Sequence, residues 1–573
     1  MFYNFEIRKH MKIYFLFSGF LLFFQVGYSQ NDFQVKNLAA FCKYWGFLKY
    51  YHPATSKRNI DWDTVLTNNY FKVKAAESKE KFNQILLSVS QKLGELKQVK
   101  YSIKPSDSEA INADFKWMED TTIISSQVCN YLRRVKKNHK PFKNRYIGTG
   151  FWGLTILKEK SYPEMIYPDE SYRFLSLARY WNVINYYFPD KYLMDNNWNS
   201  SLEKAIPIFI NASDKDEYYR AIEWITARTN DSHASIVSSP FIDSTFKTPP
   251  FVPYYSNDTL TIIRIANDSI ANIFNIKKGD AIIKINGKSI RDLWQDVKEH
   301  YSASNESFAQ YWWANSSIMT RNKHDSSELV IIREGKEITI KVKNYSMKVL
   351  WKIWKFNKPV DLRSCSILTD TVSGKKYGYL NRGTLKRKEI NKFLKQMKGI
   401  DYLIINVRNY SIHNAWPKLA NKLISGKKFV ASYTQPNYKY PGYIKYYPPP
   451  FISPFRKTVG SNRNNNYKGK VIILVDHTTI SNAEYETMTL QLAPQAIIIG
   501  TQTAGADGDI STIVFPGNYK NTFTGLGWFY ADGRQTQRIG IVPDIKVDYT
   551  IQTKLNGIDP ILQRALELIR TGK

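Results

Sequence analysis

The segment Lys470-Val-Ile-Ile-Leu-Val-Asp476, followed by His477-Thr-Thr-Ile480 and Ser481-Asn-Ala-Glu484, determines how the C-terminal part of this chain folds. The residues between Lys470 and Asp476 are all apolar, which is typical of a strand covered on both faces. A polar turn follows, and apolar residues then recur in a helical pattern until Pro494. The segment therefore predicts a buried strand, a turn and a helix that begins at Ser481.

Ser481 has two interpretations that these residues leave open. At the start of a helix, unpaired amides and the positive end of the dipole would stabilise an oxyanion formed beside its hydroxyl. The pattern Ser-x-x-Glu is equally a capping box, in which Ser481 and Glu484 satisfy each other's amides. Under both interpretations, Glu484 supports the start of the helix.

Residues 1–29 predict a secretory signal peptide. Basic residues from Arg8 to Lys12 precede an apolar run from Ile13 to Val26, and small residues follow. The run is too short and too early for a spanning helix between two folded domains. We therefore expect an exported protein of the periplasm, the cell envelope or the medium.

The composition limits the partners and cofactors. The 573 residues include 81 Lys and Arg against 50 Asp and Glu, a formal net charge of +31. Such a charge suggests nucleic acid or an anionic surface. Because export is predicted and the lysines are dispersed, we exclude nucleic acid and keep an anionic lipid or glycan surface. Three cysteines allow at most one disulfide, and no histidine or acidic cluster predicts a metal, so we expect no cofactor.

An aromatic pattern occurs twice in the first half of the chain, at a constant offset of 136 residues. Both copies are predicted to be helical, over 30–97 and 171–245, with a connector at 98–170 that shows no clear pattern. Only the second copy ends in Ser232-His233, because the same offset gives Leu96 and Lys97 in the first. The recurring residues are Tyr44-Trp45, Tyr50-Tyr51, Pro53 and Trp62, then Tyr180-Trp181, Tyr186-Tyr187, Pro189 and Trp198.

Residues 252–345 predict a small β domain. Short strands are separated by turn signals, and Gly279-Asp280, an apolar run and Asn286-Gly287-Lys288 resemble a PDZ domain. PDZ domains bind peptides by adding a strand to their sheet. A module whose groove is filled by its own chain is the alternative.

Residues 346–573 predict a largely parallel sheet. Predicted strands and helices alternate through this region, including a strand at Phe429–Tyr433. The segment Thr434–Tyr467 is rich in Pro and Tyr without periodicity, which predicts a loop over the site.

This order of segments resembles the S41 peptidases, which include the C-terminal processing or tail-specific proteases, the tricorn core and the modules of interphotoreceptor retinoid-binding protein. The resemblance lies in Ser481–Glu484, in Gly500-Thr-Gln-Thr-Ala-Gly505 and in Gly540-Ile-Val-Pro-Asp544. The resemblance covers about residue 170 to the C-terminus and implies an α/β catalytic core of the ClpP/crotonase type. Together with the repeat and the PDZ-like segment, it predicts a multidomain α+β protein with a duplicated helical N-terminal region, a PDZ-like domain and this core.

The resemblance also implies site residues, with departures. Ala506 stands where tail-specific proteases have a lysine base, whereas Ser232-His233 match the Ser-His dipeptide of the tricorn-like branch. His233 is therefore the expected base for Ser481, with Ser232 assisting. The further expected roles are Gln537 orienting His233 in place of a glutamate, the amides of Asn482 and Asn409 holding the oxyanion, and His477 or His413 as substitute bases.

Two functions follow as hypotheses. The first is an exported serine peptidase that acts on unfolded or C-terminal peptide segments through Ser481 and His233. The second is a catalytically inactive S41-fold protein that binds peptides or hydrophobic ligands. In either case His233 and Ser481 belong to different predicted domains, so the site requires these domains to dock, and peptide capture by the PDZ-like domain would bias that docking.

Overall fold

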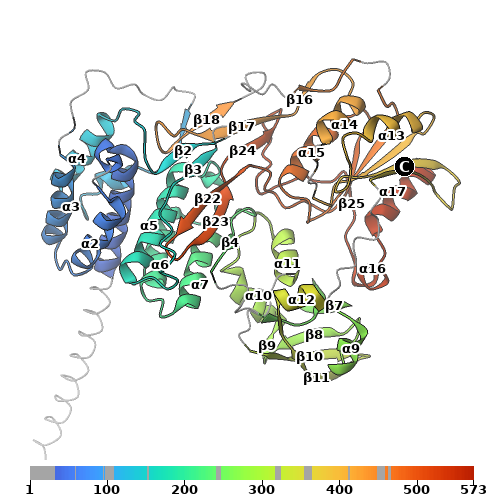
Figure 1. Cartoon of the computed structure of the whole chain (residues 1–573), viewed down its shortest axis with the longest axis horizontal. Helices are drawn as coiled ribbons and strands as arrows, with labels where there is room; N and C mark the ends of the chain where they lie inside the picture. The colour runs from blue at the N-terminus through green and yellow to red at the C-terminus, as the bar shows by residue number, and fades with distance from the viewer. Residues whose placement is uncertain are drawn as a thin grey trace, which may run out of the picture.

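The computed structural model describes residues 32–57, 60–94, 96, 109–150, 154–240, 247–315, 324–353, 364–410, 413, 415–447, 458–462 and 466–572. The predicted signal peptide lies outside these residues. Within these ranges no helix is both long and apolar enough to cross a membrane. The chain forms a helical body, a small β body and an α/β core (Figure 1).

The helical body contains both predicted repeat segments. A helix over residues 32–51 is followed by α2 (Trp62–Lys74) and α3 (Lys79–Leu93), and the later segment supplies α5 (Glu170–Tyr187), α6 (Trp198–Ile210) and α7 (Lys215–Ala227). In each segment two indole N–H groups donate to each other's backbone carbonyls. Trp45 and Trp62 do so at 2.8 and 3.0 Å, and Trp181 and Trp198 at 2.8 and 3.1 Å. The equivalent aromatic positions therefore have the same structural role in both segments.

The connector between these segments packs into the helical body. It supplies α4 (Ser126–Lys137) and the hairpin β2 (Ile147–Thr149) and β3 (Thr155–Leu157). Glu159 then forms buried ion pairs with Lys49 at 2.6 Å and with Arg179 at 3.3 Å. Arg179 also pairs with Asp63 at 2.5 Å. Since single buried charges are costly, this network fixes the connector against both helical segments.

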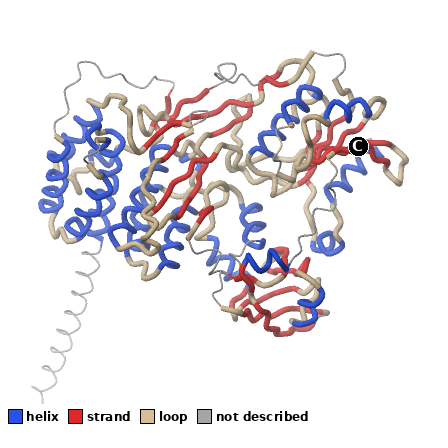
Figure 2. Tube along the Cα trace, viewed as in Figure 1, coloured by secondary structure: helices blue, strands red, loops and turns tan. Residues whose placement is uncertain are grey.

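The small β body, the separate group of strands at the bottom of Figure 2, contains an antiparallel sheet in the order β11-β10-β8-β7-β6. Asn286 and Gly287 form its predicted Asn-Gly turn, with φ values of 50° and 79°. The relation to PDZ domains stays a prediction. The elements are β6 (Phe251–Ser256), β7 (Thr259–Ile265), β8 (Ala281–Ile285), β10 (Ser326–Arg333), β11 (Lys336–Lys343), α9 (Asp268–Ile273), α10 (Ile290–Lys298) and α11 (Glu306–Asn315).

The α/β core has a sheet in the order β13-β14-β15-β20-β21-β25, parallel except for the β13–β14 pair. Alternate residues of β20 face opposite layers: Val471 and Ile473 pack toward α13, α14 and α15, whereas Ile472 and Leu474 pack toward α17. The predicted buried strand is therefore confirmed as the centre of three layers. The elements are β13 (Cys365–Thr369), β14 (Lys376–Asn381), β15 (Tyr402–Asn406), β20 (Lys470–Val475), β21 (Ile497–Gly500), β25 (Ile545–Lys546), α13 (Ile390–Gln396), α14 (Trp416–Leu423), α15 (Asn482–Leu490) and α17 (Pro560–Thr571).

Part of the predicted loop Thr434–Tyr467 is a hairpin instead. β17 (Ala431–Pro436) and β18 (Tyr443–Tyr447) pair antiparallel, and β24 (Gly527–Tyr530) and β1 (Glu109–Ile111) complete this second sheet. The prediction was wrong because Gly442, with φ 88°, turns the chain tightly enough for the tyrosine-rich flanks to pair. Residues 448–457 lie outside the described part of the chain.

A hairpin of the predicted C-terminal domain packs on the helical body. β22 (Ile510–Phe515) and β23 (Tyr519–Thr524) lie beside α5–α7 in Figure 1, and Phe515, Tyr519 and Phe523 belong to the same buried cluster as these helices. β23 also pairs with β4 (Ile236–Ser238). Because β4 directly follows Ser232-His233, this pairing brings His233 to the α/β core.

Candidate active site

Ser481 occupies the turn between β20 and α15, and its backbone is strained. Its dihedral angles are φ 60° and ψ −130°, a region that residues with a Cβ rarely adopt. A serine that only caps a helix usually has extended backbone. Such strain costs about 1–3 kcal/mol, and strained residues cluster at functional sites. The turn therefore favours a catalytic role for Ser481 over capping alone.

Glu484 holds the strained turn against the neighbouring loop. Its carboxylate accepts the Ser481 amide at 3.2 Å, the Gly505 amide at 2.8 Å, the Ala506 amide at 3.0 Å and the Thr503 hydroxyl. Burial raises the pKa of Glu484 to about 7, while these four donors oppose the rise. Glu484 thus supports the helix as predicted and also fixes the loop that begins at Thr503.

His233 follows α7 and presents one unpartnered nitrogen. Its Nδ1 lies 3.0 Å from the Thr524 Oγ1, and its backbone amide donates to Asp231 Oδ1 at 3.0 Å. Nε2 is buried and has no hydrogen-bond partner among the described residues. Burial lowers the pKa of His233, and the charge of Asp231 opposes this. The imidazole is therefore held at one nitrogen and left available at the other.

The segment Ala504–Ala506 links the Ser-His dipeptide to Ser481. The Ser232 hydroxyl donates to the Ala504 carbonyl at 2.8 Å, and the Ser481 amide donates to the Ala506 carbonyl at 2.8 Å. Two residues of chain span at most about 7 Å, so the structure brings the predicted nucleophile and base to one site. Within the described part of the chain, no hydrogen bond joins Ser481 to His233 directly.

Ser232 and Gln537 have contacts other than those expected. The Ser232 hydroxyl also accepts the Ser304 amide at 2.8 Å, so it joins three segments through backbone groups and does not reach the Ser481 hydroxyl. Gln537 was expected to orient His233, but its Nε2 donates to Asp231 Oδ1 at 3.1 Å. Gln537 therefore contacts the carboxylate that also accepts the Thr524 hydroxyl beside the imidazole. The missed residues are Asp231, which stands directly before the Ser-His dipeptide, and Thr524.

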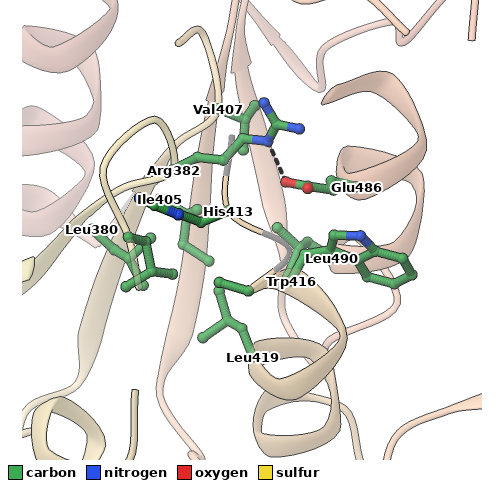
Figure 3. Close-up of a pocket in the computed structure, with 11 residues that line it drawn as sticks. Leu380, Arg382, Ile405, Val407, His413, Trp416, Leu419, Glu486 and Leu490 are labelled. Atoms are coloured by element: carbon green, nitrogen blue, oxygen red, sulfur yellow. Dashed lines mark hydrogen bonds and ion pairs between the residues drawn. The ribbon is translucent and has the colours of Figure 1, made fainter. Parts of the chain in front are cut away.

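The expected oxyanion residues are joined by a buried ion pair. Asn482 Nδ2 donates to Glu486 Oε1 at 3.1 Å, and Glu486 pairs with Arg382. Arg382 Nη1 then donates to the Asn409 carbonyl at 3.2 Å. Figure 3 shows Arg382 and Glu486 pointing toward each other beside an apolar cavity. This pair therefore sets the position of the Asn409 loop relative to the first turn of α15.

That cavity is small. Its volume of about 10 Å³ is close to the minimum for a single water molecule, and Arg382 Nη2 is a buried donor without a partner among the described residues. His413, one of the substitute bases, lines this cavity (Figure 3). His477, the other, packs its ring 4.1 Å from that of Tyr311. The structure thus gives His413 and His477 different surroundings from those of His233.

Residues 376–547 match the family model of peptidase family S41. This match confirms the resemblance to the S41 peptidases inferred from the sequence, and it supports a serine peptidase, which is a hydrolase. No curated protein matches the sequence.

Solved structures show similarity to this chain at low sequence identity. Mature CPAF complexed with lactacystin has a TM-score of 0.54 and 15% identity, over 70% of this chain and 98% of that chain. A putative peptidase from Parabacteroides merdae has a TM-score of 0.43 and 12% identity, over 71% and 98% of the two chains. The photosystem II D1 C-terminal processing protease has a TM-score of 0.33 and 13% identity, over 65% and 92%. The likeness to CPAF shows that most of the described chain adopts a known fold.

Proposed function

We propose that this chain cleaves peptide bonds with Ser481 as nucleophile and His233 as general base. The observation that carries the proposal is the strained backbone of Ser481 at the start of α15, across the Ala504–Ala506 segment from the unpartnered Nε2 of His233. A nucleophile held at a helix start and a base with one nitrogen free are the two parts that acyl transfer requires.

The reaction proceeds in two transfers. The Ser481 Oγ attacks the scissile carbonyl while His233 Nε2 takes its proton, and the amides of Asn482 and Asn409 stabilise the oxyanion. His233 then gives the proton to the leaving amine. Water then attacks the acyl-enzyme in the same way, with His233 as the base, and this step restores Ser481. The Asn482 amide suits this role because the first amides of a helix have no acceptor within the helix.

The proposal includes a substrate class and a location for the protein. The signal-like residues 1–29 support export, and unfolded or C-terminal peptide segments are the proposed substrates. The net charge of +31 supports contact with an anionic surface of the envelope. Capture of the peptide by the small β body would supply substrate to the site.

A binding protein without activity is the second candidate. Its support is the missing hydrogen bond between Ser481 and His233 in the described structure, together with Asn409 and Tyr410 where the resemblance leads one to expect glycines. Stabilisation by peptides that is unchanged in Ser481→Ala would favour this candidate.

A fluorophosphonate probe distinguishes the two candidates. We expect the folded wild type to be labelled and Ser481→Ala to be silent, because the probe reacts with an activated serine. Ser88→Ala serves as the matched control, since Ser88 lies exposed on α3. Absence of labelling in folded wild type, or equal labelling of Ser481→Ala, overturns the peptidase proposal.

A further inference from the structure

His233 Nδ1 is hydrogen-bonded to a hydroxyl, and this hydroxyl is hydrogen-bonded to a carboxylate. His233 Nδ1 lies 3.0 Å from Thr524 Oγ1, and Thr524 Oγ1 donates to Asp231 Oδ1 at 2.8 Å. Asp231 and Thr524 are fully buried. We propose that Thr524 and Asp231 act as positioning residues for His233, in which the threonine hydroxyl connects the imidazole to the carboxylate. This inference rests on the proposed role of His233 as the base.

The positions of the protons follow from the chemistry of the three groups. An ionised carboxylate only accepts hydrogen bonds, and a threonine hydroxyl has a single proton to donate. Because Thr524 donates that proton to Asp231, its oxygen accepts from the imidazole. His233 must then carry its proton on Nδ1, which leaves the lone pair on Nε2. We call the hydrogen-bonded series His233, Thr524 and Asp231 the relay. It selects the tautomer of His233 that can take a proton from Ser481.

Asp231 is a carboxylate whose oxygens accept hydrogen bonds from several neighbouring groups. Besides the Thr524 hydroxyl, it accepts the His233 amide at 3.0 Å, the Thr524 amide at 2.7 Å and the Gln537 side chain at 3.1 Å. Four donors therefore converge on its two oxygens, and these oxygens act only as acceptors. Gln537 therefore acts on His233 through Asp231.

Two other buried carboxyls, Asp190 and Asp507, accept fewer hydrogen bonds than Asp231. Both oxygens of Asp190 are without partners among the described residues, and burial raises its pKa to about 8. Asp507 accepts the Thr536 hydroxyl at 3.0 Å, and burial beside Glu484 raises its pKa well above the usual range. Burial thus favours the neutral form of both carboxyls, whereas Asp231 is the carboxylate that Thr524 links to the imidazole.

The relay stabilises the charge that the reaction creates on His233. When Nε2 takes the Ser481 proton, the ring becomes an imidazolium with protons on both nitrogens. The Nδ1 proton stays in its hydrogen bond to Thr524, and the negative charge of Asp231 offsets the new positive charge. No proton passes through the threonine. The Nε2 proton leaves with the amine, so the protons balance over the cycle.

Three variants test the relay. Thr524→Val keeps the shape and the backbone amide but removes the hydroxyl, Thr524→Ser keeps the hydroxyl, and Asp231→Asn removes the charge. We expect Thr524→Val and Asp231→Asn to lower kcat by roughly 100-fold or more with little change in KM. Thr524→Ser should stay within about tenfold of wild type because it retains the relay. Thr512→Val is the matched control, since Thr512 lies exposed on β22 of the same hairpin.

A second readout separates the relay from simple support of the fold. In Asp231→Asn, the acid limb of kcat/KM should move to lower pH, because the imidazolium loses its nearby negative charge. Nitrogen NMR of histidine in the wild type should show the Nδ1–H tautomer for His233, which is a measurement that needs no turnover. Thermal unfolding of each variant shows whether it folds.

The outcomes are distinct for this inference and for the proposed function. Wild-type kcat in folded Thr524→Val, or an Nε2–H tautomer in the wild type, overturns the relay. If the probe does not label the wild type, the peptidase proposal is overturned. If NMR shows the Nδ1–H tautomer in that same protein, the geometry of the relay is still supported. If Asp231→Asn does not fold, Thr524→Val and Thr524→Ser still decide the matter.

Discussion

The Ser304 hydroxyl accepts the backbone amide of Ser232 at 2.9 Å, and the Ser304 amide donates to the Ser232 hydroxyl at 2.8 Å. This reciprocal pair attaches the small β body to the end of the helical body, directly beside His233. From the same segment, Asn305 Nδ2 donates to the Thr503 carbonyl of the α/β core at 2.8 Å. All three bodies therefore meet at the candidate site.

The first prediction concerns this junction. Deletion of about residues 252–345 should reduce turnover of short and long peptides alike, because it removes Ser304 and Asn305 together with the sheet. Asn305→Ala tests the contact alone and should lower kcat several-fold, while Asn272→Ala, exposed on α9, should not. Undiminished turnover by the deletion variant would show that the small β body is not needed for assembly of the site.

The second prediction concerns Glu484. Glu484→Gln places an amide NH₂ group where a carboxylate oxygen accepts backbone amides, so at least one buried N–H loses its acceptor. We expect a loss of about 2–4 kcal/mol in the free energy of unfolding, measured in urea, together with weaker labelling of Ser481. Glu337→Gln on the exposed face of β11 is the matched control. Equal stability of both variants would mean that the loop from Thr503 is held by other contacts.

The third prediction concerns the ion pair beside the oxyanion loop. The side chains of Arg382 and Glu486 are only 5% and 3% exposed, so Arg382→Met leaves an uncompensated buried charge. Such a change costs about 3–5 kcal/mol and should lower kcat, because the Asn409 carbonyl loses its donor. Arg534→Met breaks the exposed pair with Asp532 and should cost about 1 kcal/mol or less. Similar losses in the two variants would contradict the assigned role of Arg382.

The central strand and the Ser481 turn could be predicted from sequence because their signals are local. Every residue from Val471 to Val475 is apolar, so both faces of β20 had to be covered. The strain at Ser481 could not be predicted, since Ser-x-x-Glu is compatible with ordinary capping. It arises from the contacts of Ser481 with Ala506 and Glu484.

The partners of His233 could not be predicted because they depend on long-range pairing. Thr524 ends β23, and no local signal in the sequence identifies the neighbour of this strand. Only the pairing of β23 with β4 brings Thr524 to His233, across 291 residues of sequence. The sequence predicts that Gln537 orients His233, whereas its hydrogen-bond partner in the structure is Asp231.

The fourth prediction concerns Asp190. Its pKa of about 8 compares with an unfolded value of about 3.9, so between these pH values the folded state holds a proton that the unfolded state has lost. The contribution of Asp190 to stability is therefore complete below pH 4 and lost as pH rises to 8. At about 1.4 kcal/mol per pKa unit, the loss is at most about 6 kcal/mol.

Asp190→Asn should remove this pH dependence and be more stable than wild type at pH 8. Thermal unfolding between pH 5 and pH 8 measures it, with exposed Asp268→Asn on α9 as the control. Parallel pH profiles for wild type and Asp190→Asn would show that Asp190 ionises at an ordinary pH.

The fifth prediction concerns the pH dependence of activity. An unperturbed histidine titrates at about 6.5, which is the midpoint that the sequence alone predicts for His233. In the structure burial lowers the pKa of His233 more than Asp231 raises it. Because a general base acts in its neutral form, the acid limb of kcat/KM should have its midpoint below 6.5.

Steady-state rates on a peptide substrate from pH 4 to pH 8 measure this midpoint. His233→Gln should lower kcat by roughly 1,000-fold or more, because it removes the proposed acceptor of the Ser481 proton. His300→Gln, in the small β body, should leave kcat unchanged. A midpoint at or above 6.5 would contradict the burial argument. Wild-type rates in His233→Gln would reject His233 as the base and direct the search to His477 and His413, whose imidazoles lie on the α/β core itself.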